Sequence, residues 1–262
     1  MGFFTAETVA TGGVLGAALL LIVLERTIPY NSEQVLFRKG FWNDLGMYTI
    51  VQSFVLSQVI FGFAFWLDGV TGLSTEGILS HWPVWGQLLF SLILHDFYIY
   101  WFHRWQHRSR YLWRTHEAHH STEDVDWLSG SRSHSLEILI NQTVEFAPLI
   151  LLGCAPETIA LKGMIDAIWG MYIHSNINVR SGVIQYIING PEMHRWHHAV
   201  DNDAHNKNFG TKFALWDWIF GTAFFPHNRK PLGYGLGDGD FPTNYFHQHT
   251  YAFRKFEEEN HD

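Results

Sequence analysis

Five apolar stretches divide the chain into alternating hydrophobic and polar segments, and they cover residues 8–24, 43–68, 83–102, 137–153 and 157–175. A helix needs about 20 residues to cross a bilayer, with a range of about 17–25. The second and third stretches reach that length comfortably, and the other three approach it. The pattern therefore predicts an all-α protein, an integral membrane bundle of about four to five membrane helices.

A tight turn, Gly153-Cys154-Ala155-Pro156, joins the last two stretches and predicts a helical hairpin. This hairpin either crosses the membrane or enters and leaves it on one side. The first stretch differs from a secretory signal, because no basic residue precedes it and Glu25-Arg26 follows it. A soluble protein with long buried core helices is the alternative interpretation of these segments.

Basic residues lie on one side of the predicted membrane. If all five stretches cross and the N-terminus lies outside, the inside segments are 25–42, 103–136 and 176–262. These hold every Lys and Arg of the chain's 17 except Lys162, whereas the outside loop 69–82 holds none. Positive residues favour the cytoplasmic side of a membrane. We therefore expect a multi-pass protein with a polar cap, helical and rich in histidine, on the cytoplasmic side.

Composition narrows the function further. The net charge of −8 argues against a nucleic-acid partner. Aromatic residues make up 16% of the chain, with 12 Trp, which suits a membrane interface or an apolar pocket. Cys154 is the one cysteine, so the sequence predicts no internal disulfide and no cysteine-based zinc site, and we expect Cys154 to lie in the core.

Histidines are concentrated just beyond the apolar stretches. Residues 103–120 read HRWQHRSRYLWRTHEAHH and residues 194–198 read HRWHH, which together hold eight of 17 histidines. The His-x-x-His-His pattern occurs twice, and positions i, i+3 and i+4 share one face of a helix. Imidazoles gathered in this way bind transition metals in proteins. Eight of them suit two ions better than one.

The surroundings of these clusters support a metal site. The sequence from His95 to His107 contains no Gly or Pro, so one helix should carry His103 and His107. Asp96 lies about two turns before His103 on the same stripe, where a carboxylate could orient a ligand histidine. The turn Asn189-Gly190-Pro191 allows a new helix to begin before the third cluster. Coordination requires neutral imidazole and thereby avoids repulsion between protonated rings.

Three other histidines are candidates of lower rank. His174 ends the fifth stretch, on the face that carries the clusters, and is expected as a ninth ligand. His134 opens the fourth stretch and is either a ligand or a helix cap. His95 lies deeper in the third stretch and could support the ligands from behind.

Nitrogen ligands suit iron, copper or zinc. A metal pair at a membrane edge suggests an apolar substrate, and two irons with O2 can oxidise an unactivated C–H bond by hydroxylation or desaturation. Hydrolysis by two zinc ions fits less well, because such sites usually include carboxylate ligands. Five tryptophans near the clusters should restrict water around the metals: Trp101, Trp105, Trp113, Trp127 and Trp196.

Five motifs resemble the fatty acid hydroxylase/sterol desaturase superfamily: HDFYIYWFHRWQH, HEAHHS, HRWHH, Asn208-Phe209-Gly210 and WDWIFGT at 216–222. The resemblance runs from about residue 90 to 226. It implies a membrane-bound non-haem di-iron oxygenase acting on a lipid, such as a sterol or a fatty acyl chain, with O2 as co-substrate. Asn208 and Asp217 match positions that support the site. The implied metal ligands are His103, His107, His116, His119, His120, His174, His194, His197 and His198.

The resemblance also implies a domain organisation. Residues 1–82 form N-terminal membrane helices, 83–226 the di-metal domain and 227–262 a C-terminal tail. No cytochrome b5 domain is recognisable, so we expect electrons from a separate electron-transfer protein. The compact length is typical of bacterial members, which places the protein in the inner membrane. The main alternative is a membrane carrier of metal or haem without oxygenase activity, although haem binding would place single histidines on facing helices near the bilayer centre.

Overall fold

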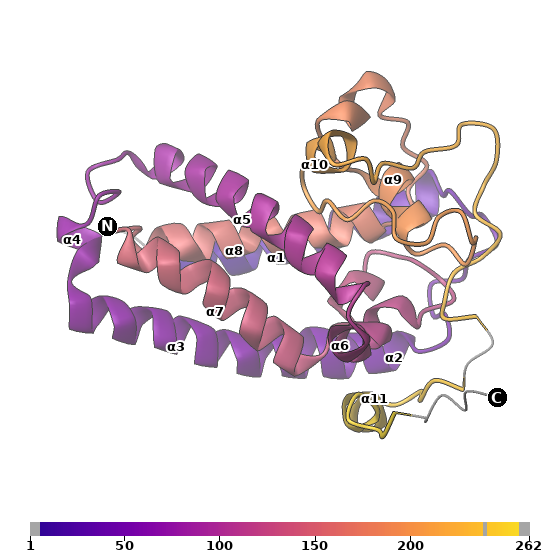
Figure 1. The fold of residues 1–262 in the computed structure, drawn as a ribbon, viewed down its shortest axis with the longest axis horizontal. Helices are drawn as coiled ribbons and strands as arrows, with labels where there is room; N and C mark the ends of the chain where they lie inside the picture. The colour runs from indigo at the N-terminus through magenta and orange to yellow at the C-terminus, as the bar shows by residue number, and fades with distance from the viewer. Residues whose placement is uncertain (1–5, 238–239, 257–262) are drawn as a thin grey trace.

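The computed structural model describes residues 6–237 and 240–256 of the 262-residue chain, and within these ranges the protein is helical without a β-strand (Figure 1). Its α-helices and two kinds of tighter or wider helix (η1, a π-helix; η2 and η3, 3-10 helices) follow one another in this order: α1 (Ala6–Thr27), α2 (Phe41–Asn43), η1 (Asp44–Gln52), α3 (Ser53–Thr71), α4 (Leu73–Glu76), α5 (Val84–Gln106), α6 (Arg110–His120), η2 (Ser129–Ser131), α7 (Ser135–Leu151), α8 (Pro156–His174), η3 (Gly182–Tyr186), α9 (Pro191–His197), α10 (Leu215–Ile219) and α11 (Tyr245–Tyr251). Each predicted apolar stretch thus forms a helix.

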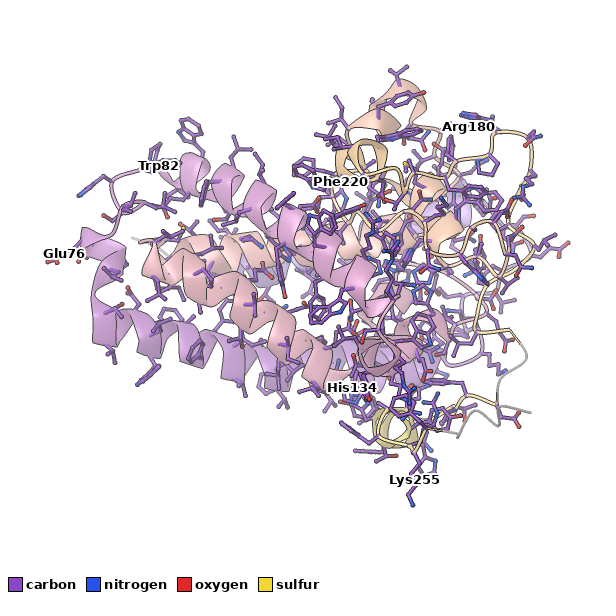
Figure 2. The ribbon with its side chains drawn as sticks, viewed as in Figure 1. Glu76, Trp82, His134, Arg180, Phe220 and Lys255 are labelled. Atoms are coloured by element: carbon purple, nitrogen blue, oxygen red, sulfur yellow. The ribbon has the colours of Figure 1, made fainter. Side chains whose placement is uncertain are left out.

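The long helices form an elongated bundle (Figure 1). The short helix α4 lies at one end of the bundle, and the other short helices lie at the opposite end, where residues 107–134, 175–237 and 240–256 form a cap. Helix α1 packs along α8, α3 along α7, and α5 against both α7 and α8. Large apolar side chains on the outside of the bundle, such as Leu19, Phe54 and Trp85, are exposed. Nitrogen and oxygen atoms are concentrated in the cap (Figure 2). This division is the one expected for a bundle in lipid and a cap in water.

Two helical segments in the described residues are long and apolar enough to cross a membrane, Thr8–Thr27 and Phe41–Thr71. In the most apolar 18 residues of each segment, only 11% and 22% are buried, whereas core helices of a soluble protein would be mostly buried. Helix α5, which we expected to qualify, is not among them. Its 23 residues include Gln87, Ser91 and Asp96 on the buried face, and these polar side chains interrupt its apolar character. The number of crossings stays a prediction.

The predicted turn between α7 and α8 is confirmed, and it packs against the loop that follows α4. Gly153 has a positive φ of 100°, and a Cβ on it would lie 2.8 Å from the Cα of Gly77. The N–H of Leu79 donates to the carbonyl of Leu152 at 2.7 Å. Cys154 is buried here among Leu149, Ile150 and other apolar side chains, as expected. Glycine is needed because both backbone conformation and space exclude a side chain.

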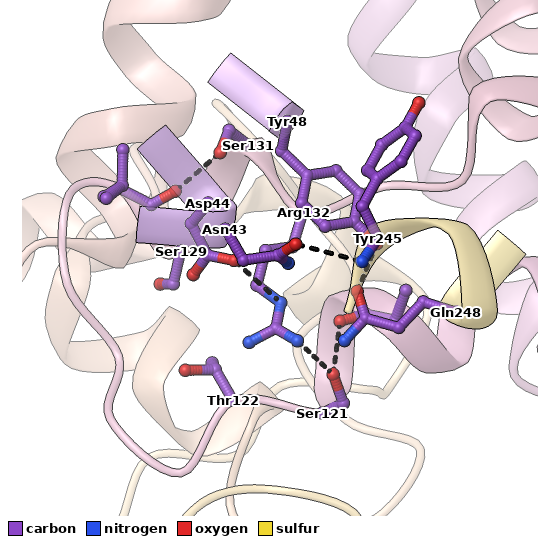
Figure 3. Close-up of polar contacts among 12 residues, drawn as sticks. Asn43, Asp44, Tyr48, Ser121, Thr122, Ser129, Ser131, Arg132, Tyr245 and Gln248 are labelled. Atoms are coloured by element: carbon purple, nitrogen blue, oxygen red, sulfur yellow. Dashed lines mark hydrogen bonds and ion pairs between the residues drawn. The ribbon is translucent and has the colours of Figure 1, made fainter. Parts of the chain in front are cut away.

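The π-helix η1 leads from the cap into α3, and the sequence pattern gave no sign of it. Its buried residues Asp44, Tyr48 and Gln52 recur every four positions and face the cap. Asp44 pairs with Arg38 at 2.9 Å, and Arg132 lies between Asp44 and the hydroxyl of Ser121 (Figure 3). π-helical turns are rare and often occur at functional sites. This one fixes Arg132, whose backbone carbonyl reaches the candidate site.

The C-terminal segment, expected as a tail, packs through α11 and Arg254 against the segment that contains α2 and η1 and against α6. The phenol of Tyr48 donates to the side chain of Gln248 at 2.6 Å, and the N–H of Tyr245 donates to Asn43 at 2.9 Å (Figure 3). Arg254 binds both carboxylate oxygens of Glu117 at 2.8 Å. These contacts connect the segment to η1 and α6.

The Gly153 turn gives a stability prediction. Gly153→Ala should lower the free energy of unfolding by about 1–3 kcal/mol, because the added Cβ overlaps Gly77. Thermal unfolding in detergent measures the effect. The control is Gly62→Ala in α3, where nothing lies within 4 Å of the new Cβ and alanine favours the helix. Equal unfolding temperatures for the two variants would contradict this account of the turn.

Candidate metal centre

The first two histidines lie where α5 leaves the bundle. His103 is in the last turn of α5, and His107 is the residue that follows the helix. The helix runs unbroken through residues 95–106, as predicted. A separation of four residues places both rings on one face, with their centroids 5.1 Å apart.

Helix α6 carries the second cluster. Ser109 precedes the helix and caps it, because its hydroxyl accepts a hydrogen bond from the N–H of Leu112. His116, His119 and His120 are buried near its C-terminal end. Helix α9 carries the third cluster and begins at Pro191 after Gly190, as the turn signal predicts. His174 is the last residue of α8 and reaches the same place.

The nine histidines converge in two adjoining groups. The first group contains His103, His107, His116, His120 and His197, and the second contains His119, His174, His194 and His198. In each group the candidate ligand nitrogens all lie within 4.8 Å of one another. Ring contacts join the groups, as between His120 and His198, whose centroids are 4.6 Å apart. Each His-x-x-His-His motif therefore contributes to both groups.

The assignment follows the helix geometry. His103 and His107, His116 and His120, and His194 and His198 are pairs four residues apart, and each pair stays in one group. His119 and His197, at position i+3 of their motifs, belong to the other group. With about 100° of rotation per residue, positions i+3 and i+4 lie on opposite sides of position i. The motif can thus direct neighbouring histidines to two metals.

Most rings are held by the nitrogen that faces away from the group. The Nδ1 atom of His103 pairs with the carbonyl of Phe209 at 2.9 Å, that of His119 with the carbonyl of Arg132 at 3.1 Å, and that of His197 with the carbonyl of Lys207 at 2.8 Å. His116 pairs in the same way with the carboxylate of Glu137 at 3.0 Å. Because these partners accept hydrogen bonds, Nδ1 carries the proton and Nε2 presents a lone pair.

The Nε2 atoms of each group converge on a common centre. In the second group, Nε2 of His174 lies 2.9 Å from that of His194, 3.1 Å from that of His198 and 3.2 Å from that of His119. A metal with four nitrogen ligands at about 2.0–2.1 Å has ligand–ligand separations of about 3.3 Å. In the first group, Nε2 of His107, His120 and His197 is buried without a hydrogen-bond partner among the described residues. Both groups therefore fit a cation.

Electrostatics keep these histidines ready to coordinate. Burial, reinforced by neighbouring imidazoles, holds the pKa values of His119, His120, His194 and His198 well below the usual range. Burial likewise lowers the pKa of His197 to about 3. The rings are neutral at physiological pH, which is the state that binds metals.

A cavity of about 620 Å³ leads from the surface of the cap to the two groups. His107, His120, His197 and His198 line it, so the cavity gives access mainly to the first group. Trp113 also lines it and lies against His107, with ring centroids 5.0 Å apart. The remaining lining comes from polar loops, chiefly residues 199–206 and 235–237.

The five predicted tryptophans do not form one wall around the metals. Trp113 lines the cavity, whereas Trp127 and Trp196 are buried in small apolar clusters elsewhere in the cap. Trp101 and Trp105 are exposed on the outside of α5. The positions of these two residues fit anchoring at a membrane interface, which the aromatic content of the chain also suggests.

Asp96 has a role different from the one we expected. Its carboxylate accepts hydrogen bonds from the Thr211 hydroxyl and from the backbone N–H groups of Lys212 and Phe213, at 2.6–2.9 Å. The indole of Trp216 donates to it as well, at 3.0 Å. With these four donors satisfied, Asp96 fastens the 211–216 segment to α5 and orients no ligand histidine.

His95 and His134 lie outside both groups. His95 contacts Glu145 at 3.1 Å and accepts a hydrogen bond from the Lys162 ammonium at 3.0 Å, deep in the bundle. His134 caps α7 by accepting from the N–H of Leu136, and its other nitrogen donates to the carbonyl of His249. The capping alternative for His134 is thus the one that the structure supports.

Asn208 supports the site from behind. It has a positive φ of 56°, and its amide donates to the carbonyls of Met193 and Phe224 at 2.8 and 2.7 Å. The first contact holds α9 next to His194. Asp217 accepts from the N–H groups of Phe209 and Gly210, both at 2.8 Å, and so fixes the carbonyl that orients His103. The sequence did not predict that Glu137 binds His116. Glu137 lies in the first turn of α7, and no regular spacing relates it to the histidines.

Comparison with protein families agrees with this geometry. The family model described as fatty acid hydroxylase matches residues 88–222, which is more than half of the chain and includes all nine histidines of the two groups. The chain belongs to the fatty acid hydroxylase family. A comparison with solved structures gives no significant match.

Curated relatives of this family member act on lipids according to their names. Ornithine lipid hydroxylase OlsE of Rhizobium tropici is 26% identical over 229 residues, which cover 85% of this chain and 69% of that protein. Human alkylglycerol monooxygenase is 33% identical over 141 residues, 54% of this chain but only 31% of the human protein. A very-long-chain aldehyde decarbonylase of Oryza sativa is 28% identical over 164 residues, 62% of this chain and 61% of the rice protein.

The two groups predict different responses to loss of one ligand. His198→Ala leaves three imidazoles in the second group and should lower the metal content from about two ions to about one. His197→Ala leaves four in the first group and should retain more metal. Metal analysis of purified protein measures both, with His227→Ala, at an exposed residue away from the cavity, as the control. Greater loss from His197→Ala than from His198→Ala would refute the assignment.

Asp217 should matter through the backbone that it holds. Asp217→Asn replaces an acceptor by an amide N–H that faces backbone donors, which should cost about 1–3 kcal/mol of stability. It should also weaken metal retention, because the carbonyl of Phe209 loses its support. Unfolding temperature and metal content report the two effects. Asp203→Asn, at an exposed ion pair, is the control and should change neither by a measurable amount.

Proposed function

We propose that this protein is a membrane-bound non-haem di-iron oxygenase that hydroxylates, or desaturates, a C–H bond of a lipid. The observation that carries this proposal is the pair of buried histidine groups at the end of an apolar bundle. Nitrogen ligands suit iron, and no described carboxylate belongs to either group, which disfavours two-zinc hydrolysis. Two bound irons would supply the activation of O2 and the oxidation of the substrate.

The protein's own residues would bind, orient and shield. Hydrogen bonds from Nδ1 to backbone carbonyls and to Glu137 fix the direction of each ring. Phe209 is buried against His103 and His107, with ring centroids 5.5 and 5.3 Å apart, and keeps water from that side. The cavity leaves the other side of the first group accessible, and we propose that O2 and the substrate carbon meet there.

The reaction requires electrons from outside. Hydroxylation converts the C–H bond and O2 into an alcohol and water, and it consumes two electrons and two protons. Desaturation consumes the same electrons and protons while the substrate loses two hydrogens and O2 becomes two waters. We propose that a separate electron-transfer protein supplies the electrons to the exposed side of the cap.

We propose a membrane lipid as the substrate. The relatives are named for ornithine lipid and alkylglycerol substrates, and both of these are lipids with polar heads. The exposed apolar bundle supports a location among such molecules. We further propose a multi-pass arrangement in a bacterial inner membrane with the cap on the cytoplasmic side, since the basic residues are concentrated in the cap and in 25–42.

The geometry disfavours a haem or metal carrier. Haem binding would place single histidines on facing helices, whereas these histidines are grouped as five and four at one end of the bundle. A transport path would need polar ligands along the bundle. The described ligand candidates outside the two groups are His95, Glu145 and Asp166, and the ammonium of Lys162 lies among them.

Labelled oxygen tests the proposed reaction. Cells that express the protein under 18O2 should contain a lipid heavier by one 18O atom, or a lipid lighter by two hydrogens, detected by mass spectrometry of total lipids. His119→Ala, which removes a ligand of the second group, should abolish the change. Purified protein should contain about two iron ions and show no haem absorption. Incorporation of 18O from water, or an unchanged lipid profile with iron bound, would overturn the proposal.

A further inference from the structure

An exposed apolar surface lies on the side of the cap, next to the end of α5. It consists of Val183, Ile184, Tyr186 and Ile187 at η3 and of Trp218 and Ile219 at α10, and we call it the shelf. Val183 is 80% exposed, and Ile184 and Ile219 are each 57% exposed. The sequence after residue 176 had indicated a polar region, so this surface is unexpected. Six large apolar side chains in one exposed place are unusual for a surface in water.

The shelf is a defined structure. The indole N–H of Trp218 donates to the carbonyl of Gln185 at 2.9 Å, and the N–H of Leu215 donates to the carbonyl of Ile187 at 3.3 Å. The rings of Tyr186 and Trp218 contact each other, with centroids 4.6 Å apart. Backbone hydrogen bonds and ring packing therefore join η3 to α10, and the apolar side chains project from a fixed platform.

The platform is fastened to the bundle at one level along α5. Asp96 accepts hydrogen bonds from Phe213 and Trp216 just before and within α10. Phe220, at the end of α10, packs against Trp101 of α5 with ring centroids 4.8 Å apart. Figure 1 shows α10 beside the end of α5, and Figure 2 places Phe220 in the corner between the bundle and the cap.

The shelf carries no charge on its surface. No charged residue occurs between Arg180 and Glu192, and between Lys212 and Arg229 the one charged residue is Asp217, which is buried. The surface continues along the outside of α5, where Phe97 and Trp101 are exposed. Arg180 is exposed at the edge of the shelf, and Arg104 lies over Trp101 at 5.4 Å. An apolar face bordered by Trp, Tyr and Arg is typical of elements in a membrane interface.

We propose that η3 and α10 insert into the lipid at the membrane surface and lie in its plane beside α5. The occupant of the shelf is thus the bilayer and not a protein partner, because the shelf is uncharged and continuous with the lipid-facing side of α5. The inference rests on the membrane location given under the proposed function. Interfacial helices bury their apolar faces about 5–10 Å into the boundary between headgroups and acyl chains.

Insertion would set the height of the metal centre. Asp217 of α10 accepts from the N–H of Phe209, whose carbonyl orients His103. The shelf and the first histidine group are therefore parts of one hydrogen-bonded unit. With the shelf in the interface, the histidines lie at the level of the lipid headgroups, where a lipid substrate is available.

Spin labels at single cysteines test the insertion in the full chain, reconstituted in vesicles. In a Cys154→Ala background, Val183→Cys and Ile219→Cys report the shelf. Val59→Cys on exposed α3 is the lipid control, and Asn228→Cys in an exposed cap turn is the water control. The unsubstituted chain is the control for labelling and should take up little spin label, because its one cysteine, Cys154, is buried. The measurement is the ratio of collisions with O2, which enters lipid, to collisions with a water-soluble nickel complex.

We expect ratios at positions 183 and 219 that lie above the value at 228 and below the value at 59. Shelf values equal to the value at 228, with a high value at 59, would overturn the insertion and leave the membrane location intact. A water-like value at 59 would overturn both.

The unsubstituted chain offers a second test in case a cysteine variant does not fold. A photoactivatable phospholipid in the vesicles should crosslink to peptides that contain residues 182–187 and 215–219 at several times the yield of the 226–230 peptide. Equal or lower yields in the shelf peptides would overturn the insertion.

Discussion

Neutral imidazoles with their lone pairs facing one another are the constraint on which the structure depends. In the second group the Nε2 atoms of His174, His194 and His198 lie 2.9–3.2 Å apart, close to the spacing of nitrogen ligands around one metal ion. Burial removes the option of protonating the rings. The opposite nitrogens of several rings are bound to carbonyls and to Glu137, so the lone pairs of those rings have one direction. Binding of the proposed metals would therefore be coupled to the fold of the cap.

Buried carboxylates assemble the loops that carry this arrangement. Glu25 of α1 accepts from the N–H groups of Trp127 and Asn176, both at 2.8 Å, and so attaches the cap to the bundle. Asp96 and Asp217 bind backbone N–H groups of residues 209–213 in the same way. A carboxylate satisfied by several backbone donors holds irregular chain more firmly than apolar contacts, which have no direction.

The hydrophobic pattern predicted the long helices, and the repeated spacing of eight histidines predicted that these would gather. His174 was expected beside them because it ends the fifth apolar stretch. The turn at Gly153 and the start of α9 at Pro191 were predicted from the glycine and proline residues there, which mark turns. The sequence did not predict that His119 and His120 belong to different groups, because this depends on how α6 faces α8 and α9. The role of Asp96 was misjudged because its partners lie more than a hundred residues away, and the π-helix leaves no periodic signal of its own.

One polar cluster inside the bundle explains how distant ligands meet. The ammonium of Lys162 in α8 contacts Asp166 of the same helix, Glu145 of α7 and His95 of α5. The positive charge of Lys162 and the carboxylates offset one another where water is scarce. His95 precedes His103 by eight residues, and Asp166 precedes His174 by eight residues. Eight residues of helix span about 12 Å. Locking α5 to α8 at this level therefore brings His103 and His174 to the same height, and a slip of either helix by one turn would separate the two groups.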